Sequence, residues 1–139
     1  MASSVRRRLR FDSITHQTRL DGHCLMSVRL EWYGRYHESE HEGLETHQGR
    51  LQAAASAALG AALAAAGKRF HSELLGVKAV RAFDGWVVVV RLYAEARGNT
   101  VRLLGAASCE SEEGLGQGAA IAVLDATNRV LEKGLEEEG

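Results

Sequence analysis

The chain has 139 residues, of which 45% are apolar and 25% charged, and its formal net charge is −1 at pH 7. This size and composition are typical of one soluble domain, and the near-neutral charge argues against a protein that mainly binds the phosphate backbone of nucleic acid. No apolar run approaches the roughly 20 residues of a membrane helix, and the N-terminus lacks the apolar region of a signal peptide. We therefore expect a cytoplasmic protein without membrane or nucleic-acid partners.

The first half of the chain predicts three strands followed by a helix. Residues 6–20 form a polar strand, and Asp21-Gly22 is a strong signal for the hairpin turn after it. In the second strand, apolar residues alternate with polar ones, as in a strand with one buried face; they are Cys24, Met26, Val28, Leu30 and Trp32. A turn at Gly34 leads to a third strand over residues 36–43. An alanine-rich helix over 46–66 then ends at Gly67.

The second half repeats this order. Strands are expected over 74–83, 86–96 and 101–109, and a helix over 116–133 that stops at Gly134. Val-Arg-Leu occurs at 28–30 and again at 90–92, and Gln-Gly opens both helical segments, at 48–49 and 117–118. We therefore divide the single domain, residues 1–139, into two repeats of about 5–67 and 74–134, followed by an acidic tail over 135–139.

These elements predict an α+β fold built from a duplicated β-β-β-α unit. We expect two layers, in which one mainly antiparallel, six-stranded sheet is backed by two helices related by pseudo-twofold symmetry. The continuous apolar run WVVVV at 86–90 predicts a central strand that is covered on both faces. Ten alanines between Ala53 and Ala66 give the first helix more smooth apolar surface than a single core stripe requires. Burial of that surface against a second copy predicts a homodimer.

Residues 37–47 read HESEHEGLETH and contain a His-Glu-x-x-His motif. On a helix, this spacing places His37 and His41 on one face as zinc ligands, with Glu38 as general base and His47 as a third ligand. On a strand, the same spacing separates the two Cα atoms by roughly 13 Å, which is too far for one zinc ion. The backbone of this segment therefore decides whether it can bind zinc.

We interpret the histidine segment as the third strand of the first unit, because it lacks the apolar stripe of a buried active-site helix. This interpretation predicts no catalytic residue, no metal and no cofactor here. Two alternatives remain. The segment could be helical and form a small zinc-dependent hydrolase with Glu38, His37, His41 and His47, or His41 and His47 could share a metal across the strand-to-helix loop.

Gly114, Gly116 and Gly118 open the last predicted helix, where free backbone amides can hold an anion. The segment lacks the Lys-Ser/Thr pair of a P-loop and the G-x-G-x-x-G spacing of a dinucleotide site, so a flexible helix entry is the simpler interpretation. Further along this helix, three polar side chains are expected to pair at the surface; they are Asp125, Asn128 and Arg129.

The duplicated unit, with its closing stretch GNTVRLLGAASCESEEGLGQGAAIAVLDATNRVL, resembles the C-terminal regulatory domain of alpha-isopropylmalate synthase. In that family a strand pair ends in glycine and small residues, and the following helix carries an alanine-rich, Asp-containing face. Comparable places are occupied here by Gly105, Ala106, Ser108, Ala119, Ala122, Leu124 and Asp125. The resemblance spans nearly the whole chain, in element order and in a loose residue pattern.

The family domain binds leucine at a dimer interface and feeds back on a separate catalytic barrel, which this chain does not contain. The entry to the first helix matches the family's turn only at Gly43 and Gly49, without its proline. By analogy, a small metabolite or amino acid is expected near the helix entries, around Gly43–Gly49 and Gly114–Gly118. The function expected from the whole sequence is a noncatalytic small-molecule-sensing or scaffold module, dimeric and acting on a separate partner protein.

Overall fold

The computed structural model describes residues 8–67, 70–96 and 98–138. Its elements are β1 (Arg10–Thr18), β2 (His23–Trp32), β3 (Arg35–Leu44), α1 (His47–Ala66), β4 (His71–Ala82), β5 (Gly85–Ala96), β6 (Asn99–Cys109), a 3-10 helix η3 (Glu112–Gly114) and α2 (Leu115–Glu138). The order strand-strand-strand-helix occurs twice. The predicted α+β class and the repeated unit are therefore confirmed.

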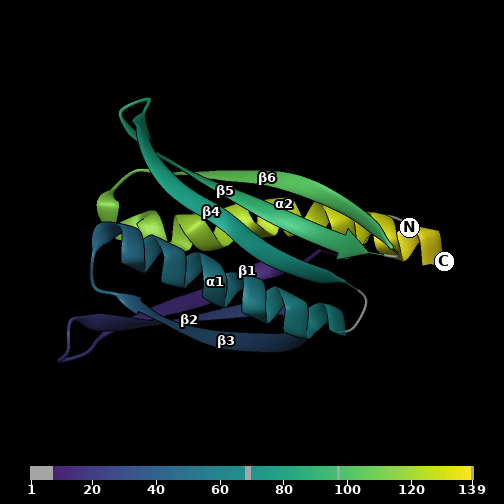
Figure 1. Cartoon of the computed structure of the whole chain (residues 1–139), viewed down its shortest axis with the longest axis horizontal. Coiled ribbons are helices and arrows are strands. Elements are labelled where there is room, and N and C mark those ends of the chain that lie inside the picture. The colour runs from purple at the N-terminus through teal and green to yellow at the C-terminus, as the bar shows by residue number, and fades with distance from the viewer. Residues whose placement is uncertain (1–7, 68–69, 97, 139) are drawn as a thin grey trace.

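The six strands form two three-stranded antiparallel sheets, ordered β1-β2-β3 and β4-β5-β6, where one six-stranded sheet was predicted. Figure 1 shows α1 and α2 lying between the two sheets, so the domain has three layers instead of two. Each helix packs mainly on the sheet of its own unit and also contacts the other helix and the first strand of the other unit. A helix that is apolar all round needs cover on more than one side, and the second sheet supplies that cover.

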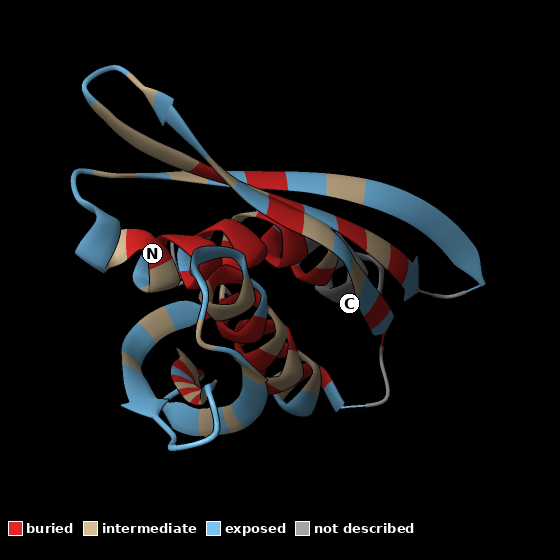
Figure 2. Ribbon diagram, turned by 60° about the vertical axis from the view of Figure 1, so that its left-hand side comes forward, coloured by how far each residue is buried: buried red, intermediate tan, exposed pale blue. Residues whose placement is uncertain are grey.

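The alanines of α1 are covered within the chain. Seven of them are at most 1% exposed: Ala53, Ala54, Ala55, Ala57, Ala58, Ala61 and Ala62. The buried residues of α1 are distributed around the helix instead of along one stripe, and Figure 2 shows both helices largely buried between mostly exposed outer strands. The smooth alanine surface of α1 is therefore buried inside one chain, and it no longer supports the predicted homodimer.

The central strands supply the rest of the core. In β2 the alternating residues predicted from the sequence are all buried, from Cys24 to Trp32. In β5 the buried positions are Val88, Val90, Leu92 and Ala94, whereas Val87 and Val89 on the other face are partly exposed. The prediction that residues 86–90 are covered on both faces is therefore wrong, because the helix layer lies on only one side of the β4-β5-β6 sheet (Figure 1).

Three of the four helix ends follow local signals in the sequence. Thr46 is the N-cap of α1 and its side chain accepts a hydrogen bond from Gly49 N at 2.9 Å. Gly67 ends α1 with φ of 67°, as its sequence position predicted. The entry of α2 at Leu115 lies within one residue of the prediction, but the helix continues past Gly134 to Glu138. One glycine among good helix formers weakens a helix without ending it; Gly139 lies outside the described residues.

Candidate functional site

The histidine segment is extended. Residues 35–44 form β3, and in its register with β2 His37 pairs with Leu30 and His41 with Met26. Glu38 lies between them in sequence and so on the opposite face of the strand. The alternative zinc hydrolase site of His37, Glu38, His41 and His47 is therefore wrong, because it needs a helical turn where the chain forms a strand.

His47 is separated from the other two histidines by its position at the first turn of α1. Its ring centroid lies 5.8 Å from that of Trp86 on β5. Among the described residues, no metal-ligand cluster includes His37, His41 or His47. The structure therefore gives no support to a metal shared by His41 and His47.

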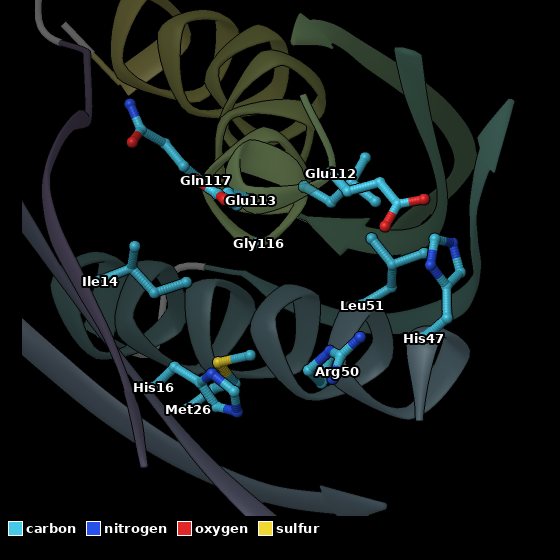
Figure 3. Close-up of a pocket in the computed structure, with 11 residues that line it drawn as sticks. Ile14, His16, Met26, His47, Arg50, Leu51, Glu112, Glu113, Gly116 and Gln117 are labelled. Atoms are coloured by element: carbon cyan, nitrogen blue, oxygen red, sulfur yellow. The ribbon is translucent and has the colours of Figure 1, made fainter. Parts of the chain in front are cut away.

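A cavity of about 480 Å³ lies between the entries of the two helices (Figure 3). Its lining comes from β1, β2, the first turns of α1 and the segment from η3 into α2: Ile14, His16, Met26, His47, Arg50, Leu51, Glu112, Glu113, Leu115, Gly116 and Gln117. Both repeats contribute to the wall, because the helices lie side by side and start at the same end of the domain (Figure 1).

The lining combines apolar side chains with charges of both signs. Ile14, Met26, Leu51 and Leu115 provide the apolar part. The first unit contributes His16, His47 and Arg50, and the second contributes Glu112, Glu113 and Gln117. Figure 3 shows this separation, with Arg50 and His16 on the α1 side and Gln117 and Glu113 on the α2 side. Such a lining fits a small molecule that carries both charges and an apolar body.

The predicted glycine positions divide into two groups. Gly116 lines the cavity, and a Cβ there would lie 3.3 Å from Ile14 Cδ1. Gly43 and Gly49 instead allow β3 and α1 to approach each other, since a Cβ on Gly43 would lie 2.8 Å from the carbonyl oxygen of Gly49. Gly118 packs against Val88, and Gly114 lies beside Cys109. Of these five glycines only Gly116 lines the cavity, and the other four lie in close packing contacts.

Beside the cavity, the carboxylate of Glu45 is held by three side chains. Thr18 Oγ1 donates to Glu45 Oε1 at 2.8 Å, Arg50 Nη1 donates to Oε2 at 3.0 Å, and His16 Nε2 lies 2.9 Å from Oε1. The hydrogen bond from Thr18 is the largest cause that lowers the pKa of Glu45 to about 2, with further contributions from His16 and Arg50. Desolvation opposes this effect. Glu45 is therefore an ionised acceptor at neutral pH.

Cys24 lies beside this network. Its side chain is fully buried, and its Sγ donates a hydrogen bond to the carbonyl oxygen of Leu44 at 3.7 Å. Burial, and then the negative charge of Glu45, raise the pKa of the Cys24 thiol. No sequence motif joins these residues, which come from β1, β2 and the turn before α1, so only the tertiary structure identifies them.

Comparisons with known proteins do not assign a family. The sequence matches no family model and no curated protein. The resemblance to the regulatory domain of alpha-isopropylmalate synthase therefore stays a prediction. None of the helices within the described ranges is long and apolar enough to cross a membrane.

Proposed function

We propose that this protein is a noncatalytic small-molecule-sensing module that acts on a separate partner protein. Its ligand is a small zwitterionic metabolite of the amino-acid class, held in the cavity between the entries of α1 and α2. The observation that carries this proposal is the composition of that cavity, in which Arg50 lies on the α1 side, Glu112 and Glu113 come from the segment that leads into α2, and four apolar side chains share the lining.

Each part of such a ligand has a chemical counterpart in the lining. A guanidinium fork matches a carboxylate, and Arg50 uses one of its N–H donors on Glu45. Glu112 or Glu113 matches an ammonium group. Ile14, Met26, Leu51 and Leu115 match an aliphatic side chain, whose burial contributes about 25 cal/mol per Å².

The position of the cavity suggests how binding could be sensed. A ligand there contacts residues of both repeats, including Arg50 of the first and Glu113 of the second. It therefore stabilises the arrangement of the two units that best fits it, and a partner protein that recognises this arrangement would respond.

A thermal-shift screen tests the proposal, because a ligand that binds only the native state raises the melting temperature. The panel contains the protein amino acids, their decarboxylated and deaminated analogues, and acyl-CoA-type metabolites. We expect amino acids with aliphatic side chains to raise the melting temperature. The decarboxylated and deaminated analogues should raise it less. A screen in which no amino acid shifts the melting temperature contradicts the proposal.

Variants locate the binding. Arg50→Ala removes the proposed partner of the ligand's carboxylate. Gly116→Leu fills the cavity, because a side chain at this position points toward Ile14. Both should abolish the ligand-induced shift. Arg19→Ala is the matched control, because this exposed arginine pairs only loosely with Glu42, at 3.9 Å. A shift that survives in Gly116→Leu places the ligand elsewhere.

Association as a homodimer also stays a proposal, now based on the family resemblance alone. Light scattering coupled to size exclusion measures it directly, with and without an active ligand from the screen. A monomer at all concentrations contradicts the dimer and leaves the ligand proposal standing, because every residue that lines the cavity belongs to one chain.

A further inference from the structure

Three side chains with metal-binding atoms meet beside the cavity, although they are far apart in sequence. Ligand atoms of His16, Cys24 and Glu45 all lie within 4.8 Å of one another. The sheet explains this meeting, since β1 and β2 pair Thr18 with Cys24, and β2 and β3 pair Cys24 with Gly43, two residues before Glu45. The first sheet and the turn before α1 therefore build the cluster.

The donor set is that of a zinc site. An imidazole nitrogen, a cysteine sulfur and a carboxylate oxygen are the three ligand types that zinc uses in proteins, and a sulfur ligand argues against magnesium or calcium. Three protein ligands leave a fourth tetrahedral position for water or for another small ligand.

The side chains around the cluster hold Glu45 in position, as outer partners do for metal ligands in proteins. Thr18 and Arg50 hydrogen-bond the Glu45 carboxylate at 2.8 and 3.0 Å, and metal-ligating carboxylates commonly have such outer partners. Cys24 is fully buried, whereas the side chains of Glu45 and His16 are 18% and 40% exposed. An ion at this position is shielded on the Cys24 side and reachable from the His16 side.

We propose that His16, Cys24 and Glu45 bind a zinc ion, with its remaining coordination position toward the cavity that His16 and Arg50 line. In the bound form His16 Nε2 and Glu45 Oε1, which lie 2.9 Å apart, each turn from the other toward the ion. Zinc binding does not require the amino-acid ligand proposed above, because its three ligands are side chains of this chain, although His16 also lines the cavity. Its competing explanation is a purely structural hydrogen-bond network around Glu45.

A cobalt titration distinguishes the two explanations. The protein is produced without a histidine tag, stripped with a chelator, and titrated with Co²⁺ in the absence of amino acids. We expect binding that saturates near one equivalent, tetrahedral visible bands, and a near-ultraviolet charge-transfer band from a thiolate ligand. Zn²⁺ should displace the cobalt and raise the melting temperature. Absence of the charge-transfer band overturns the proposal.

Matched variants assign the ligands. His16→Ala and Cys24→Ser should each lower the metal affinity by about 100-fold or more, since loss of an outer partner alone costs 10–100-fold. Cys109→Ser and His41→Ala should bind like the parent protein, because neither residue belongs to the cluster. The assignment is overturned if Cys109→Ser or His41→Ala lowers the metal affinity as much as His16→Ala does. It is also overturned if His16→Ala leaves the metal affinity unchanged. His16 is exposed enough to be replaced without unfolding, so it decides the matter if Cys24→Ser does not fold.

Discussion

The side-chain amide of Asn128 forms two hydrogen bonds with the backbone of Leu9. Leu9 N donates to Asn128 Oδ1 at 2.8 Å, and Asn128 Nδ2 donates to the Leu9 carbonyl oxygen at 3.2 Å. Both residues are buried, with Asn128 only 4% exposed. The pair joins the chain just before β1 to α2 and so connects the two units. The predicted surface pairing holds for Asp125 and Arg129, 3.2 Å apart, but not for Asn128.

Asn128→Ala should destabilise the protein by about 2–4 kcal/mol, because it leaves a buried N–H and a buried C=O of Leu9 without partners and each costs about 1–3 kcal/mol. Chemical denaturation measures the change. Arg129→Ala, one residue along α2 with a 58% exposed side chain, is the control and should cost about 1 kcal/mol or less. Equal effects of the two substitutions would mean that the Leu9 contact contributes little.

Gly49→Ala should also destabilise the protein, by about 1–3 kcal/mol, although alanine is the better helix former. The added Cβ would overlap the carbonyl oxygen of Leu44, so β3 and α1 must separate. Gly76→Ala is the control, because a Cβ there meets nothing within 4 Å. Thermal unfolding without ligand is the measurement. If Gly49→Ala leaves the stability unchanged, the close approach of β3 and α1 does not depend on this glycine.

Ala54→Leu tests whether the alanine surface of α1 is used within one chain. Ala54 is 0% exposed and its Cβ faces Gly116 of α2. Three extra heavy atoms there should cost about 1–3 kcal/mol by overpacking at any protein concentration. Gln52→Leu, at an exposed position of the same helix, should be close to neutral. A cost for Ala54→Leu that varies with protein concentration would instead indicate a contact between copies.

The low pKa of Glu45 makes part of the stability depend on pH. Its folded pKa of about 2 lies below its ordinary value of 4.5, so the stabilisation is fully present above pH 4.5 and is lost as the pH falls toward 2. Glu45→Gln should therefore be less stable than the parent at pH 7, and the gap should narrow between pH 4.5 and 2. Unfolding is measured with a chelator present, so that no metal contributes. A stability difference between the two proteins that stays constant from pH 4.5 to 2 would contradict the lowered pKa of Glu45.

Sequence patterns determined the local structure because their causes are local. Period-two alternation in residues 24–32 defined a buried strand face, and a glycine able to adopt positive φ ended α1 at residue 67. The same local reasoning favoured a strand for the histidine segment but left the zinc hydrolase as an alternative. The structure excludes it, since His37 and His41 lie too far apart on the strand β3. The strands expected over 74–83 and 86–96 place the turn between them at residues 84–85, whereas the structure places it at Phe83 and Asp84, which both have a positive φ.

Contacts between distant segments of the chain decided the layering of the sheets, the cavity and the candidate metal ligands. An alanine-rich helix can be buried on one side or on all sides, and its sequence is the same in both cases, so only the fold showed that two sheets enclose it. His16, Cys24 and Glu45 carry no shared motif, because strand pairing brings them together across 29 residues of chain. The sequence by itself thus determined the elements and their duplication. The tertiary structure decided the layering, the cavity and the candidate ligands, since these depend on which surfaces meet.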